Sequence, residues 1–142
     1  MTRPRTPRWP AVPPRGLRPM LARDQVLDLG LCHISNLDAI ARGTAGETVL
    51  WHWVGSVLTW SRVAELTGAG VSEMESQLAL TTRLIERYGR TGAVRFDGAD
   101  YQLAKVGLDV MDQLASLADR RTAIAAADWS EARVNRMAAE CI

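Results

Sequence analysis

The sequence predicts an all-α protein: a small bundle of four to five helices around a tryptophan-rich central helix. Residues 46–67 hold three of the five tryptophans and no proline, as one long helix requires. All six prolines lie within residues 4–19, which leaves the rest of the chain without this helix breaker. A chain of 142 residues is long enough for one domain with a substantial core. We therefore divide it into an Arg/Pro-rich flexible arm, residues 1–22, and a single helical domain, residues 23–142.

The arm is basic, whereas the domain that follows it is acidic. Residues 1–23 contain no acidic side chain and six arginines: Arg3, Arg5, Arg8, Arg15, Arg18 and Arg23. The other residues carry 17 − 6 = 11 basic and 16 acidic side chains, a balance of −5 that the net charge of +1 conceals. Because proline removes backbone donors and favours extended conformations, we expect a disordered or extended arm. Its arginines are candidates for binding an anionic partner, or for a strap across the acidic domain.

The first predicted helix begins near Asp24, a residue type that caps helix N-termini. Its apolar side chains are Val26, Leu27, Leu29, Leu31 and Ile34. Ser35, followed three residues later by Asp38, predicts that this helix breaks and restarts. Gly43 is expected to end it.

The second predicted helix, residues 46–67, is apolar on most of its surface. One face carries Leu50, Trp53, Val57, Trp60 and Ala64, and the flanking positions are Trp51, Val54 and Leu58. A helix with so wide an apolar surface must be covered on several sides, so we place it at the centre of the bundle. The sequence from Thr44 to Glu47 is typical of a capping box, and Gly68 and Gly70 follow the helix.

The later segments are also mainly helical. A capping box from Ser72 to Glu75 opens a third helix, whose stripe is Met74, Leu78, Thr81, Ile85 and Tyr88. Residues 94–101 alternate around Asp97-Gly98, which allows a short β-hairpin. A long helix is then expected from Asp100 through the alanines at 123–127, with Asp128 capping a last helix.

Residues 63–78 resemble the core of a helix-turn-helix, with Ala64 and Gly68 at the alanine and turn-glycine positions. The next helix carries Arg83, Arg87 and Arg90 on one face, and Arg95 follows it. These four arginines are candidates for binding nucleic acid or another partner. Glu73 and Glu75, at the start of the would-be recognition helix, oppose binding to a phosphate-lined groove.

Catalytic chemistry has little support in the sequence. Cys32, His33 and His52 permit a weak hypothesis of a metal-dependent hydrolase, but a zinc site needs about four ligands, usually in local pairs. We therefore predict no catalytic residue, no metal ligand and no cofactor, and we expect the protein not to be an enzyme.

The sequence also bears on location. The longest apolar run, residues 49–60, is about twelve residues long, whereas about twenty are needed to span a bilayer. Cys32 and Cys141 match no metal or redox spacing and are expected to be free thiols. The expectation is a cytoplasmic protein with no membrane partner.

Five short strings resemble small uncharacterised proteins encoded in prophages of GC-rich proteobacteria. They are Arg18-Pro-Met, the string from Arg23 to Gly30, residues 36–41, residues 58–61 and residues 101–107. The likeness covers nearly the whole length after the arm. It implies a mobile-element accessory protein, and it brings no catalytic or binding residues because that group has no assigned activity.

The leading hypothesis is therefore a non-enzymatic, helical interaction protein. It would bind an anionic or macromolecular partner, an unknown protein or nucleic acid of phage or host, through its arm and its helical body. The alternative is a helix-turn-helix-like DNA-binding transcriptional regulator. The oligomeric state stays open, with a homodimer among the options.

Overall fold

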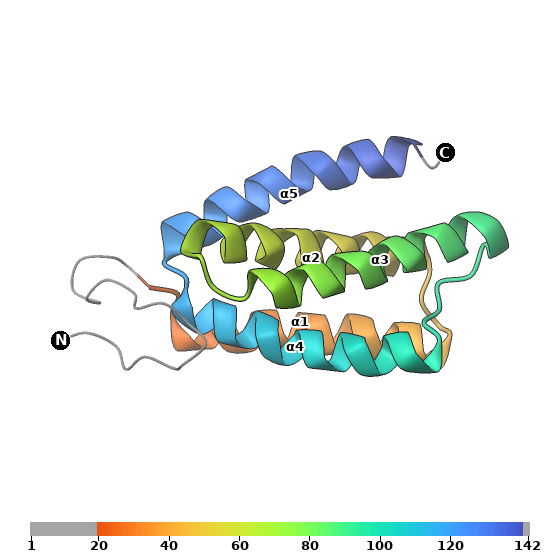
Figure 1. Cartoon of the computed structure of the whole chain (residues 1–142), viewed down its shortest axis with the longest axis horizontal. Helices are drawn as coiled ribbons and strands as arrows, with labels where there is room; N and C mark the ends of the chain where they lie inside the picture. Colours follow the sequence, from red (N-terminus) through yellow and green to blue (C-terminus); the bar gives the residue numbers. More distant parts are fainter. Residues whose placement is uncertain (1–19, 141–142) are drawn as a thin grey trace.

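The computed structural model describes residues 20–140, with only the backbone described for Arg23 and Leu27 (Figure 1). Five helices follow one another: α1 (Arg23–Arg42), α2 (Glu47–Thr67), α3 (Val71–Thr91), α4 (Gly98–Leu117) and α5 (Arg120–Glu140). Each has 20 or 21 residues and is therefore about 30 Å long. The all-α class that the sequence predicts is confirmed.

Helices α1 to α4 pack as a bundle, and α5 lies outside it (Figure 1). In Figure 1, α1 and α4 form the lower layer, α2 and α3 the middle layer, and α5 crosses above them. α1 and α3 each pack against both α2 and α4, whereas α5 packs mainly against α2. α2 therefore contacts each of the other four helices.

The core follows from the apolar surface of α2. Five of its residues at helical spacing are buried: Leu50, Trp53, Val57, Trp60 and Ala64. They meet buried side chains such as Leu80 and Leu84 of α3 and Met111 and Leu114 of α4. Trp51 differs, because it is half-buried and its Nε1 donates a hydrogen bond to Glu47 Oε1 at 3.3 Å.

The β-hairpin that the sequence allows near residues 94–101 is not formed in the described part of the chain. Asp97 instead caps α4, since its carboxylate accepts a hydrogen bond from the Asp100 backbone N–H at 2.7 Å. Val94 is buried, and Phe96 packs edge-on against Trp53 with ring centroids 5.6 Å apart. The apolar residues that alternate in the sequence therefore anchor an extended connection to the core.

Three predicted helix boundaries are wrong, among them the cap at Asp128, which lies inside α5. α1 runs without a break through Ser35, because Leu37 and Ile40 continue its buried face. The predicted helix from Asp100 to 127 is two helices: α4 ends at Leu117, and α5 begins at Arg120. Asp119 makes the break, since its carboxylate accepts a hydrogen bond from the Thr122 backbone N–H at 2.7 Å.

None of the helices in residues 20–140 combines the length and the apolar character that crossing a bilayer requires.

Candidate functional site

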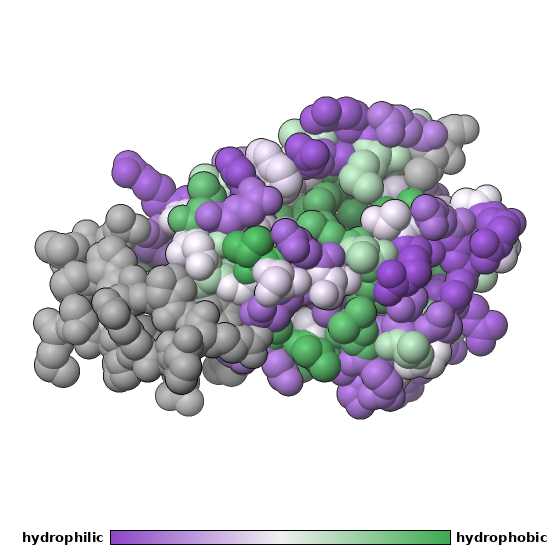
Figure 2. All heavy atoms as spheres, viewed as in Figure 1, coloured by the Kyte–Doolittle hydropathy of each residue, from purple (hydrophilic) through white to green (hydrophobic). Residues whose placement is uncertain are grey.

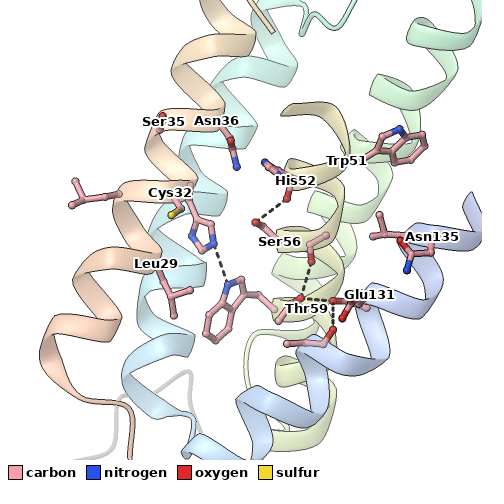
Figure 3. Close-up of a pocket in the computed structure, with 17 residues that line it drawn as sticks. Leu29, Cys32, Ser35, Asn36, Trp51, His52, Ser56, Thr59, Glu131 and Asn135 are labelled. Carbon is pink, nitrogen blue, oxygen red and sulfur yellow. Dashed lines mark hydrogen bonds between the residues drawn. The ribbon is translucent and has the colours of Figure 1, made fainter. Parts of the chain in front are cut away.

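A groove of about 690 Å³ lies between α1, α2 and α5. Its walls come from residues 29–36 of α1 and 127–135 of α5, and its floor comes from residues 51–60 of α2; we call it the α5 groove. Figure 3 shows Leu29 and Asn36 on the α1 side, Ser56 and Thr59 on α2, and Glu131 on α5 across the opening. A volume of this size falls within the range typical of ligand sites, about 300–1,000 Å³.

α5 packs against α2 along a seam of small residues, and the groove lies between this seam and α1. Thr59 and Ser130 share a hydrogen bond of 2.6 Å between their hydroxyl oxygens. Gly55 leaves room for Val134, whose Cγ2 lies 3.7 Å from where a Cβ of residue 55 would stand. Ala126 is fully buried. The α2 surface between α1 and α5 is only partly covered, since His52 is exposed and most of the other α2 residues of the groove are half-buried.

An aromatic residue fixes the outer side of the same seam. Trp129 of α5 lies between two guanidinium groups, with Arg133 at 4.5 Å and Arg62 at 5.3 Å from its ring centroid. Such cation–π contacts contribute about 0.5–1 kcal/mol each at exposed sites. The contact with Arg62 joins α5 to α2, whereas Arg133 belongs to α5 itself, and Trp129 does not line the groove.

The most buried titratable group of the groove is His33. Its side chain is 5% exposed, and its Nε2 accepts a hydrogen bond of 3.3 Å from the Trp60 indole. Burial lowers the pKa of His33, and the nearby Asp112 carboxylate opposes that shift more weakly. The imidazole is therefore neutral at pH 7, with its proton on Nδ1.

The groove hydroxyls of α2 and α5 are already hydrogen-bonded. Ser56 donates to the His52 carbonyl. Thr59 and Ser130 have one hydroxyl proton each, so one of them donates to the other, which in turn donates to a carbonyl of its own helix, Gly55 for Thr59 or Ala127 for Ser130. In the described residues, none of these hydroxyls is hydrogen-bonded to a histidine side chain, as an activated nucleophile would be. The groove thus offers apolar contact area with a few polar groups at its edges.

The fold does not bring the three residues of the hydrolase hypothesis together in one site. Cys32 is exposed, His33 is buried against Trp60, and His52 is exposed on α2. Within residues 20–140, no three side chains of the His, Cys, Asp and Glu types gather as a metal would need. Cys141 lies outside the described residues.

The predicted arginine face of α3 is largely bonded to the start of α4. Arg83 makes a bidentate contact with Asp100, with Nη2 at 2.7 Å from Oδ1 and Nε at 3.1 Å from Oδ2. This hydrogen bonding raises the already high pKa of Arg83. Arg87 donates to the Arg95 carbonyl at 3.1 Å and lies 3.6 Å from the Asp97 carboxylate.

The remaining predicted site residues are not brought together with these. Arg90 and the side chain of Arg95 are exposed. Arg3, Arg5, Arg8, Arg15 and Arg18 lie outside the described residues, and only the backbone of Arg23 is described. α2 and α3 pack side by side in opposite directions (Figure 1), whereas the two helices of a helix-turn-helix cross steeply.

Comparisons of the chain with protein-family models, with curated proteins and with solved structures gave no match.

The sequence did not predict the α5 groove, because the start of α5 was expected to belong to the same helix as α4. One signal for the seam was present: Gly55 and Thr59 on α2, and Ala126 and Ser130 on α5, are small residues four positions apart. Residues at this spacing share a helix face, and small side chains there allow two helices to approach closely.

Proposed function

We propose that this protein is a non-enzymatic interaction protein whose helical body binds an apolar helix of a partner protein in the α5 groove. The observation that carries the proposal is the groove of about 690 Å³ over the partly covered surface of α2 between α1 and α5. In this proposal α2 is the central helix of the fold, because it supports the other helices and also forms the floor of the groove.

The dimensions of the groove suit a helix face. Residues 51–60 of α2 span nine steps of 1.5 Å, or about 14 Å. A partner helix presents apolar anchors at positions i, i+4 and i+7 over a similar length. The polar groups along the opening, Asn36, Glu131 and Asn135, are placed to contact the polar sides of such a helix.

The arginines of residues 1–23 have a separate role in this proposal, which is to contact an anionic partner. If all six neutralised phosphates, the logarithm of the affinity for duplex DNA would fall with the logarithm of salt concentration at a slope of about −5, from −0.9 × 6. An affinity that does not change with salt would remove phosphate contact from the proposal.

The groove is tested by affinity capture with three full-length proteins. Ser56→Arg places a long charged side chain in the groove, whereas Ile124→Arg places the same charge on α5 at a residue 54% exposed and outside the groove. We expect a protein captured by the wild type, in the presence of nuclease, to be retained by Ile124→Arg and lost with Ser56→Arg. Binding of the apolar dye anilinonaphthalene sulfonate should follow the same order.

Equal capture by all three proteins would refute the groove as the interface. A partner lost on nuclease treatment would instead favour nucleic-acid binding.

A further inference from the structure

A second groove, of about 660 Å³, lies between α1 and α4. Three of its apolar side chains are strongly exposed: Leu31 by 64%, Ile34 by 54% and Val106 by 55%. Asp109 and Asp112 of α4 lie in the same groove. We call this surface the α1/α4 groove. Lys105 also lines it, so the groove combines a sizeable apolar area with a net negative charge from two aspartates and one lysine.

Figure 2 shows that apolar atoms also reach the surface between α5 and the helices beneath it. The α1/α4 groove differs from that area because the chain before Met20 leaves the described structure next to it. Met20 forms an isolated antiparallel bridge with Asp119, two residues after α4 ends, and α1 begins at Arg23. The segment before Met20 therefore leaves the described structure at the end of the bundle where α1 begins and α4 ends.

Residues 1–19 have a positive charge, which is opposite to the net charge of the groove. They contain five arginines and no acidic residue, whereas the remaining residues carry 17 − 5 = 12 basic and 16 acidic side chains. Nearest to Met20 is the sequence Pro13-Pro-Arg-Gly-Leu-Arg-Pro19, in which two prolines precede two arginines. Arginine pairs with carboxylates, and its stem and the prolines cover apolar surface.

The lengths also agree. On α4 the groove runs from Asp112, seven residues before Asp119, to Gln102, 17 residues before it, which is from about 10 to about 25 Å along the helix. A polyproline II segment, which the prolines favour, advances about 3.1 Å per residue. Counted back from Met20, which is opposite Asp119, Arg15 therefore comes level with Asp109, and Pro13 and Pro14 come level with Val106.

We propose that residues 13–19 dock in the α1/α4 groove of their own chain, with Arg15 and Arg18 against Asp109 and Asp112 and with Pro13 and Pro14 on Ile34 and Val106. The docking stands independently of the α5 groove. Its consequence rests on the proposed function: an anionic partner of the arm competes with the two aspartates for the same arginines, so it must release the arm before it binds.

The docking is tested by disulfide trapping in the full chain, with Cys32→Ser and Cys141→Ser as background. Pro14→Cys is combined in turn with Ile34→Cys and with Val106→Cys. Ala132→Cys serves as the matched control, because Ala132 is exposed on α5 and, like Val106, stands 13 residues from Asp119. Under mild oxidation at low protein concentration, we expect at least one groove pair to form an intramolecular disulfide at least tenfold faster than the control pair.

The pairing of the two arginines with Asp109 and Asp112 is tested in whichever groove cysteine pair forms its disulfide faster. Neutralising both aspartates, with Asp109→Asn and Asp112→Asn, should slow trapping about fivefold, because two exposed ion pairs together contribute about that factor. Glu75→Gln with Asp128→Asn removes the same charge at exposed positions on α3 and α5 and should leave the rate unchanged. High salt should slow the wild-type groove pair by a similar factor.

Three results would overturn the proposal. Trapping of both groove pairs no faster than the control would show that the segment does not reach the groove. A disulfide that joins two chains would assign the groove to the arm of a second copy. Equal slowing by the aspartate and the control neutralisations would remove the arginine–aspartate pairing.

Discussion

The close approach of α3 and α4 at Gly107 gives the most stringent test of the packing. Gly107 is buried, and a Cβ at this position would overlap the side-chain amide of Gln77, including its Cδ and Oε1 atoms. Gln77 cannot move away freely, because it is 1% exposed and its Nε2 donates a hydrogen bond of 2.9 Å to the Leu103 carbonyl. Gly107→Ala should therefore destabilise the fold.

Opposing effects set the size of this destabilisation. Alanine is more favourable than glycine in a helix interior by about 1 kcal/mol. Overpacking a filled core costs about 1–3 kcal/mol, and loss of the Gln77 hydrogen bond costs about 1 kcal/mol more. The net expectation is a loss of about 1–3 kcal/mol. Gly89 in α3 is the matched control, since a Cβ there meets open space, and Gly89→Ala should stabilise by about 0.5–1 kcal/mol.

Urea unfolding followed by circular dichroism measures both changes. With a slope of about 2 kcal/mol per molar urea, the expected difference of about 1.5–4 kcal/mol between the two variants separates their midpoints by about 0.75–2 M. A second pair of proteins tests whether the overlap with Gln77 is the cause. In a Gln77→Ala background the Gln77 amide is absent, so Gly107→Ala should destabilise the fold by at least about 1 kcal/mol less than it does in the wild type. An equal effect of Gly107→Ala in the two backgrounds, or stabilisation by it in the wild type, would refute the reasoning.

Three further predictions concern other contacts. Burial lowers the pKa of His33 below the 6.5 of the unfolded chain. The neutral imidazole therefore contributes its full stability above pH 6.5, and this stability is lost as the pH falls below 6.5. When the urea midpoint is measured between about pH 7.5 and 5.5, His33→Phe should show a smaller fall than the wild type. Ser130→Ala removes the hydrogen bond to Thr59, and it should lower the unfolding free energy by about 1 kcal/mol and speed amide exchange in α5 more than in α4. Arg83→Met should lower the melting temperature because it unpairs a carboxylate that is 10% exposed, whereas Arg90→Met, at an exposed position, should leave it nearly unchanged.

The helix break expected at Ser35 and the β-hairpin allowed around Asp97 are not formed for one reason. Ser35 and Asp97 are residue types that serve both as caps and in other roles, and only their surroundings select between these roles. Ser35 stays within α1 because Leu37 and Ile40 beyond it enter the core. Asp97 caps α4, and does not form a hairpin turn, because burial of Val94 and packing of Phe96 on Trp53 draw the chain along the bundle.

The candidate binding residues show the same limit. The α3 arginines were identified correctly as a face, but sequence spacing says nothing of Asp100 and Asp97, which come from the next helix and bind Arg83 and Arg87. The α5 groove could not be predicted from the sequence for the same reason. Three helices line it, and its existence depends on how far α5 stands from α1.

The sequence by itself determined the all-α class, the extent of α2 and its buried face, because helical periodicity and the positions of proline and glycine are local properties of the chain. It also determined the separation of charge between residues 1–23 and the rest. The tertiary structure decided which polar side chains are paired, where α4 gives way to α5, and which apolar surfaces stay uncovered. These depend on contacts between residues far apart in the chain, and the free energy of such contacts is set by packing that no local pattern records.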